Sequence, residues 1–302
     1  MSGAGSLLTE QRNPASINID TMGASDLVEL INAEDATVAA SVARESEHIS
    51  AAVELVVSRL RRGGRLIYVG AGTSGRLGVL DAAECPPTFG SDPKMIQGVI
   101  AGGYDALVRA KEGAEDERDA GRRDLRERNV GPDDVVVGIA TSGGTPYVQG
   151  ALEEAVRSGA GTVFLSCTPV EGGSVPTDVI ITPLTGPEVI TGSTRMKAGT
   201  ATKLVLNTIT TASMVLLGKT YENLMVDLQA TCEKLRDRGC RILAATTGVG
   251  YDEAAAVMTR AGGSVKAAIV MQKAGVDLDE ANRLLAEAGG FVRKALSRRS
   301  QK

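Results

Sequence analysis

Two short segments of the chain combine glycines with hydroxyl side chains in nearly the same order. They read VGAGTSG over residues 69–75 and VGIATSG over residues 137–143, with five of seven positions identical. Each follows a short apolar run and precedes a helical pattern, so the loop can offer backbone N–H groups, hydroxyls and the positive end of a helix dipole to an anion. These features predict a phosphate site. Its expected ligands are Gly72, Thr73, Ser74, Gly75, Arg76, Ser142, Gly143, Gly144 and Thr145.

Other interpretations of these loops are weaker. Gly70, Gly72 and Gly75 match the dinucleotide pattern G-x-G-x-x-G, but that site also needs an acidic residue at the end of the second strand, where residues 100–103 read IAGG. The motif G-x-x-x-x-G-K-[ST] of ATP-hydrolysing proteins is absent. The hydroxyls could also be ordinary helix N-caps. Two such similar loops, both at the carboxyl ends of predicted parallel strands, favour a ligand site.

The elements that must position these loops alternate between strand and helix. The apolar runs and helical spacings predict strands over residues 66–69, 95–100, 135–139, 162–166 and 179–181, and helices over residues 75–83, 105–128 and 147–157. Strands this apolar that alternate with helices indicate a parallel sheet covered on both faces. The predicted fold class is therefore α/β with a doubly wound parallel sheet.

The two ends of the chain look different from this central part. Residues 8–20 are predicted to be an extended arm, and residues 26–61 have the apolar spacing of one long helix. A further helix is predicted from Ser193 to about Leu217, and the remainder has helical spacing, no convincing strand and repeated glycine breaks. We therefore expect three parts: an N-terminal arm and helix (1–50), a central α/β domain that carries the two phosphate loops (51–220) and a small C-terminal helical bundle (221–302).

Composition excludes several functions. The 302 residues carry a formal net charge of −4, no Trp and 3% aromatic residues, which argues against a nucleic-acid surface. Four scattered cysteines and a single histidine, His48, predict neither a metal site nor a disulfide framework. No apolar run approaches the roughly 20 residues that span a bilayer, and the N-terminus lacks a signal segment. We expect a cytoplasmic protein that does not bind a membrane.

Taken together, the motifs resemble those of the N-acetylmuramic acid 6-phosphate etherases, members of the sugar isomerase (SIS) domain superfamily and relatives of the glucokinase regulatory protein. The resemblance runs nearly end to end. It rests on residues 8–13 (LTEQRN) with Ser16, Ile19 and Asp20, and on residues 70–87, 112–116 (EGAED), 141–146 (TSGGTP) and 192–203 (GSTRMKAGTATK). The resemblance implies an SIS-type sheet, a homodimer with its site close to the subunit contact, no cofactor, and hydrolytic cleavage of the D-lactyl ether of N-acetylmuramate 6-phosphate.

This chemistry needs acid–base groups, because the open-chain sugar must lose its C2 proton before lactate leaves C3 and water adds back. The family match implies that Glu84 and Glu115 are the pair. We assign Glu84 to the lactate oxygen and to water, and Glu115 to C2, although the two roles can be exchanged. Residues 85–87 (CPP) are expected to end the helix after Glu84 and fix its side chain beside the sugar. Without the resemblance, Glu115 would be interpreted as one solvated carboxylate in a charged helix.

A third segment is expected to contribute to the site. Ser193, Thr194 and Lys197 lie at the predicted start of a helix, where they could give hydroxyls and a cation to the phosphate or to the lactate carboxylate. Ordinary capping of that helix is an equal alternative. Two other functions also remain open: an aldose–ketose isomerase, which needs no acid at C3, and a non-catalytic sugar-phosphate sensor like the glucokinase regulatory protein, which is longer and has two SIS units.

Overall fold

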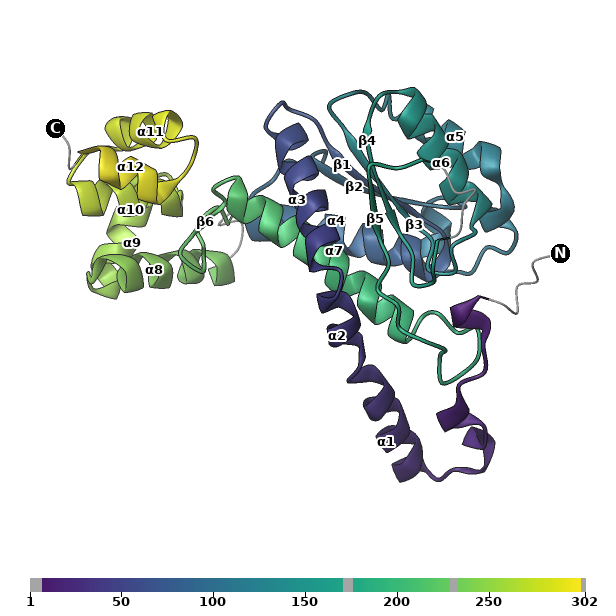
Figure 1. Ribbon diagram of the computed structural model, residues 1–302. Coiled ribbons are helices and arrows are strands. Elements are labelled where there is room, and N and C mark those ends of the chain that lie inside the picture. Colours follow the sequence, from purple (N-terminus) through teal and green to yellow (C-terminus); the bar gives the residue numbers. More distant parts are fainter. Residues whose placement is uncertain (1–6, 171–175, 229–232, 300–302) are drawn as a thin grey trace. The chain divides into compact units, whose positions relative to one another are not determined.

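One of the two units of the chain contains a five-stranded parallel sheet (Figure 1). The computed structural model describes residues 7–170, 176–228 and 233–299. The strands are β1 (Leu66–Gly70), β2 (Ile96–Ile100), β3 (Val135–Ile139), β4 (Gly161–Leu165) and β5 (Val179–Ile181). Their order is β2-β1-β3-β4-β5, and all neighbouring strands are parallel. The predicted parallel sheet is confirmed, and each predicted strand agrees with an observed one to within one residue at either end.

Helices cover both faces of this sheet, as the doubly wound prediction requires. Ile67 and Val69 of β1 belong to the apolar cluster formed with α5 (Arg118–Glu127) and α6 (Pro146–Arg157). Tyr68 points to the opposite face, where a Cβ added to Gly78 of α4 (Gly72–Phe89) would lie 2.8 Å from Tyr68 Cβ. Gly78 therefore permits the close approach of α4 to β1, and alternation along the strand places α4 and α6 on opposite faces.

The helix after β1 is longer than predicted. The sequence suggested residues 75–83 with a stop at two prolines, whereas α4 continues through Pro86 and Pro87 to Phe89. Both prolines lie in its last turn, where the missing N–H groups free only two carbonyls and break no long run of hydrogen bonds. The helix ends at Gly90, which has φ +58° and whose N–H donates to the Pro86 carbonyl at 2.9 Å. Glu84 is therefore inside α4 and not at its end, so that expectation was wrong.

The charged segment after β2 is not the single helix predicted over residues 105–128. It contains the 3₁₀ turns η5 (Tyr104–Leu107) and η6 (Ala114–Asp116), and only then α5. Gly113, with φ +74°, occupies the left-handed region immediately before η6 and interrupts the helical path. The charges had helical spacing, but no apolar stripe before Leu125 fixed a helix against the sheet.

The N-terminal predictions also need correction. The arm contains three 3₁₀ turns, η2 (Leu8–Glu10), η3 (Pro14–Ser16) and η4 (Ile19–Thr21), and is not extended. The single long helix is three helices: α1 (Ala24–Asp35), α2 (Val38–Ala43) and α3 (Ser46–Leu60). At the first break the Thr37 hydroxyl donates to the Glu34 carbonyl at 2.7 Å. Such local side-chain bonds compete with continued helix.

The C-terminal part is helical except for one small hairpin. Helix α7 (Lys197–Leu216) begins four residues after the predicted start. It is followed by the antiparallel pair β6 (Thr220–Tyr221) and β7 (Leu224–Met225), which the sequence did not predict because two-residue strands carry no periodicity. The remaining helices share one apolar core and are α8 (Glu233–Thr247), α9 (Tyr251–Arg260), α10 (Val265–Ala274), α11 (Leu278–Glu287) and α12 (Val292–Arg299).

The chain divides into two compact units, each made of two stretches. One contains residues 1–83 and 94–210, with the sheet, and the other contains residues 84–93 and 211–302, with the helical bundle. The three-part division at residues 50 and 220 stays a prediction. None of the helices in the described part of the chain is both long and apolar enough to cross a membrane.

Candidate functional site

The two glycine and hydroxyl loops start side by side at one edge of the sheet. Gly70, the last residue of β1, pairs with Ile139, the last residue of β3. These two strands are neighbours although β2 lies between them in sequence, so their helices depart to opposite faces. Ligands of open parallel sheets bind at this kind of topological switch point, outside the carboxyl ends of the strands.

The first loop is tightly built. A Cβ on Gly75 would lie 2.6 Å from the Gly70 carbonyl oxygen, so only glycine allows the turn. Gly72 begins α4 with φ +52° and is exposed, whereas Ser74 is buried. Thr73 is partly exposed and lies beside α7, because a Cβ on Gly199 would be 3.6 Å from Thr73 Cγ2. Gly72 and Thr73 are therefore the accessible part of this loop.

The second loop has more open surface. Ser142, Gly143 and Thr145 are partly exposed and Gly144 is exposed. Gly143 has φ +85°, and a Cβ there would lie 2.9 Å from Thr168 Cγ2. Thr168 Oγ1 in turn accepts a 3.3 Å hydrogen bond from the Leu8 N–H. The N-terminal arm therefore lies next to this loop, a contact that no sequence pattern indicated.

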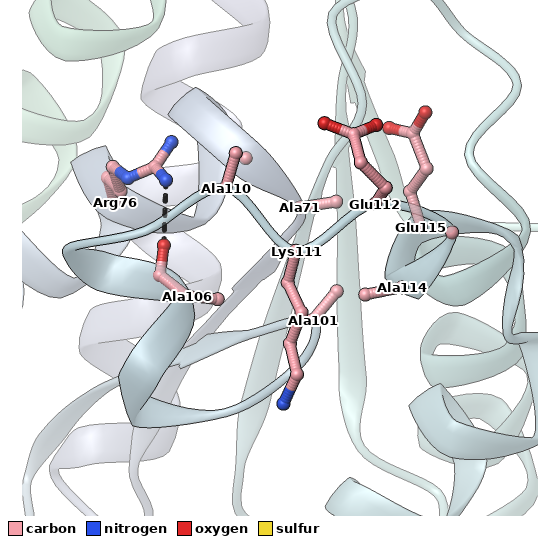
Figure 2. Close-up of a pocket in the computed structure, with 11 residues that line it drawn as sticks. Ala71, Arg76, Ala101, Ala106, Ala110, Lys111, Glu112, Ala114 and Glu115 are labelled. Atoms are coloured by element: carbon pink, nitrogen blue, oxygen red, sulfur yellow. Dashed lines mark hydrogen bonds between the residues drawn. The ribbon is translucent and has the colours of Figure 1, made fainter.

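One pocket in the sheet-containing unit adjoins the first loop (Figure 2). It has a volume of about 160 Å³. Three of the expected site residues line it: Gly72, Arg76 and Glu115. The other lining residues, which the sequence prediction did not include, are Ala71, Ala101, Ala106, Ala110, Lys111, Glu112, Gly113 and Ala114. The pocket thus brings Glu115 from η6 next to the start of α4.

The two cations of this pocket donate to backbone carbonyls. Arg76 Nε donates to the Leu107 carbonyl at 2.9 Å and Nη2 to the Ala106 carbonyl at 2.8 Å, and Figure 2 shows the guanidinium directed at η5. Lys111 Nζ donates to the Gly102 carbonyl at 2.8 Å. Both side chains therefore stabilise the segment between β2 and η6.

Glu84 does not line this pocket. It is exposed and lies twelve residues after Gly72 in α4, which is more than three helical turns. Of the two expected catalytic carboxylates, Glu115 is among the residues that line this pocket and Glu84 is not.

The start of α7 is already occupied by the protein's own groups. The fully buried Glu188 accepts hydrogen bonds from the Lys197 and Ala198 N–H groups, one on each carboxylate oxygen and both at 3.0 Å. Burial raises the pKa of Glu188, although these two N–H groups oppose the shift. Lys197 is 4% exposed and its Nζ forms an ion pair with Glu34 of α1. Ser193 and Thr194 precede this capped turn and are partly exposed.

A second buried carboxylate lies between α4 and α7. Asp81 accepts hydrogen bonds from Asn207 Nδ2 and from the Thr210 hydroxyl, the latter at 3.1 Å. Burial raises the pKa of Asp81, and the hydrogen bonds from Asn207, Tyr68 and Thr210 partly offset that rise. The sequence did not single out Asp81, although it lies within the motif at residues 70–87, or Glu188, because the groups that bind each carboxylate are not marked by any local pattern. Among the residues that the structure describes, no group of three potential metal ligands occurs.

Comparisons with known proteins found similarity to part of the chain. The family model "Glucokinase regulatory protein N-terminal SIS domain" matches residues 48–162, which include both loops and Glu115. Among solved structures, a phosphoheptose isomerase from Neisseria gonorrhoeae covers 63% of this chain and 98% of its own, with a TM-score of 0.47 and 20% identity.

Curated relatives are much closer in sequence. The N-acetylmuramic acid 6-phosphate etherase of Salinibacter ruber is 56% identical over 266 residues, which cover 88% of this chain and 86% of that protein. The protein of the same name from Symbiobacterium thermophilum is 55% identical over 264 residues, or 87% of this chain and 88% of the relative. With more than half of the aligned residues identical over most of both chains, the protein belongs to the N-acetylmuramic acid 6-phosphate etherase family.

Proposed function

We propose that this protein cleaves the D-lactyl ether of N-acetylmuramic acid 6-phosphate to give N-acetylglucosamine 6-phosphate and D-lactate. The observation that carries the proposal is the pocket that joins the first loop to Glu115, in a chain whose relatives of that name share more than half of its residues. The phosphorylated sugar is a charged metabolite that does not cross a bilayer unaided, so the proposed place of the reaction is the cytoplasm.

The proposed reaction is an elimination followed by an addition. In the open-chain sugar the C1 aldehyde acidifies the C2 proton. Glu115 takes that proton, the C3–O bond breaks, lactate leaves with a proton from Glu84, and a C2–C3 double bond remains. Water then adds its oxygen to C3 while a proton returns to C2. The two carboxylates can exchange these roles, because each step needs only one acid and one base.

We place the phosphate against the hydroxyls of the two loops. Thr73, Ser142 and Thr145 and the glycine N–H groups at residues 72, 143 and 144 are the proposed ligands, with Ser193 and Thr194 as further candidates. Ser74 and Gly75 are buried and shape the first loop. Arg76 and Lys197 would first have to release the acceptors that they now bind. Recognition by neutral donors is consistent with a phosphate that is bound and not transferred.

A homodimer is part of the proposal. Helix α1 has no buried residue, and Val28 on it is 58% exposed. We infer that a second copy of the chain covers α1. Twelve residues of α4 correspond to about 18 Å along its axis, more than a sugar ring spans, so we propose that Glu84 acts on a substrate held in the pocket of the other copy.

Isotope exchange tests the reaction. The protein is incubated with N-acetylmuramate 6-phosphate in heavy water, and D-lactate release and deuterium at C2 are measured together. Lactate release with one deuterium at C2 per turnover is the expected result. Ketose formation without lactate would make the protein an isomerase, and binding without either product would make it a sensor. Either outcome would overturn the proposal.

Mixing two inactive variants tests the shared site. Glu84→Gln and Glu115→Gln are each expected to lose at least about 100-fold in kcat. If each site uses both copies, exchange of subunits restores some sites with both carboxylates, and activity rises after mixing. No recovery in subunits that are shown to exchange would contradict a shared site.

A further inference from the structure

The pocket beside the first loop is lined by small residues and by two cationic and two anionic side chains. Seven of its eleven lining residues are alanine or glycine, and the four others are Arg76, Lys111, Glu112 and Glu115. The small residues leave the cavity open and provide no polar side chain. The chemistry of the pocket therefore depends on which of the four charged groups is available to a ligand.

The two cationic side chains donate hydrogen bonds to the protein backbone, whereas the two carboxylates accept none from the described residues. Arg76 donates to the carbonyls of Ala106 and Leu107, and Lys111 donates to the carbonyl of Gly102. Glu112 and Glu115 have no hydrogen bond or ion pair to any residue that the structure describes. A ligand that enters this pocket therefore meets two acceptors without competing protein donors.

Backbone geometry puts both carboxylates at the same end of the pocket. Gly113 separates them and has φ +74°, so the chain turns sharply between Glu112 and η6. Figure 2 shows the two carboxylate groups next to each other, on the side of the pocket away from Arg76. Lys111 holds the preceding turn, because its Cδ lies 2.7 Å from the position that a Cβ on Gly102 would occupy.

This arrangement selects one end of the proposed substrate. Two carboxylates repel a phosphate group and the lactate carboxylate, and they attract N–H and O–H donors. The sugar must therefore enter with its C1–C2 end toward Glu115 and with its phosphate toward the hydroxyl loops. The acetamido N–H is the donor bonded to C2 itself, directly beside the proton that Glu115 removes.

We propose that Glu112 accepts a hydrogen bond from the acetamido N–H of the substrate and so binds the C2 end of the sugar in the pocket. This inference rests on the proposed function. It makes Glu112 a substrate-binding residue that selects 2-acetamido sugars, and it leaves the proton transfer to Glu115.

Substitution of Glu112 gives the test. Glu112→Ala is expected to raise KM about 10- to 100-fold, the loss expected for a hydrogen bond to a charged group, with kcat within about 3-fold of wild type. Deuterium at C2 per lactate released should not change. The matched control is Glu117→Ala, which removes an exposed carboxylate of the same segment that does not line the pocket, and its KM should equal that of wild type. Circular dichroism and thermal unfolding check the fold of both variants.

Two inhibitors separate recognition of the acetamido group from a general structural role. N-acetylglucosamine 6-phosphate carries the N–H, whereas 2-deoxyglucose 6-phosphate has no donor at C2. Wild type should bind the first more tightly, and Glu112→Ala should reduce that preference by at least 10-fold. An unchanged KM, or an equal loss of affinity for both inhibitors, would overturn the role of Glu112.

Failure of the proposed function has a different signature. If wild type releases no lactate, the function is wrong, and calorimetric binding of the same two sugar phosphates still tests Glu112. If wild type is active and Glu115→Gln retains full C2 exchange, the assigned base is wrong while the Glu112 comparison is unaffected.

Discussion

At the scale of single residues, the partly exposed hydroxyl of Ser142 in the second loop is the simplest test of phosphate binding. Ser142→Ala should raise KM about 10-fold and leave kcat nearly unchanged, because a ground-state contact far from C2 and C3 is lost. Steady-state kinetics measure both constants. Ser158→Ala, at the far end of α6, serves as control. A wild-type KM in Ser142→Ala would remove this hydroxyl from the phosphate contacts.

Asp134 provides a residue-scale prediction about stability. Burial alone would raise the pKa of Asp134, but hydrogen bonds from Arg65 and from the Gly131 N–H outweigh it and lower the pKa below its usual value. The stabilisation from Asp134 is therefore present at pH values above its unfolded-state pKa of about 3.9. It is lost as pH falls through the lower pKa of the folded state.

Asp134→Asn should accordingly reduce the free energy of unfolding by about 1–3 kcal/mol at pH 7, and by less at pH 3. Urea unfolding at both pH values measures the difference. Asp133→Asn removes an exposed carboxylate paired with Arg62 and should cost less than about 1 kcal/mol. Equal costs for Asp134→Asn at both pH values would contradict the assigned ionisation.

At the scale of elements, the N-terminus of α7 depends on a carboxylate from the preceding loop. Glu188→Gln keeps the shape of the side chain but places an NH₂ group against one of two N–H donors. We expect a loss of about 1–2 kcal/mol in the free energy of unfolding. Glu47→Gln, in the exposed first turn of α3, should change it by less than about 0.5 kcal/mol. Chemical unfolding measures both free energies of unfolding. Equal losses in the two variants would argue against Glu188 as the cap of α7.

The sequence predicts elements well where burial is continuous. Buried apolar runs such as Val135–Ile139 have few alternatives to a parallel strand, so β1, β3 and β4, which are buried throughout, could be located. It predicts poorly where local signals conflict with distant contacts. The charged spacing of residues 105–128 suggested one helix, but Gly113 interrupts it. Pro86 and Pro87 suggested a helix end, but they lie in the last turn of α4 and do not stop it.

The candidate site follows the same division. Neighbouring strands β1 and β3 bring the two loops together, as their placement after apolar runs indicated. In contrast, Lys197 pairs with Glu34, which is 163 positions away, and no local pattern encodes such a contact. Glu112 lies next to Glu115 in the pocket, but a carboxylate in a charged run carries no mark that separates it from solvated neighbours.

At the scale of the whole molecule, α1 should be the contact between two copies. Val28→Asp places a charge in the proposed interface and should convert a dimer into monomers at micromolar concentration, with a lower Tm. Light scattering and sedimentation measure the mass. Ala33→Asp, at an exposed position about 140° around the same helix from Val28, should remain dimeric. A monomeric wild type, or a dimeric Val28→Asp, would refute this interface.

The division of α4 between the two units has a consequence for how the nascent chain matures. The stretch 84–93 belongs with residues 211–302, and a Cβ on Gly90 would lie only 2.2 Å from the Asp227 carbonyl oxygen. During synthesis, the ribosome releases this stretch, with the buried Cys85 and Phe89, long before residues 211–302, which belong to the same unit. Its apolar side chains therefore stay exposed to solvent until residues 211–302 have been synthesised. During this interval we expect the nascent protein to be most prone to aggregation and most dependent on chaperones.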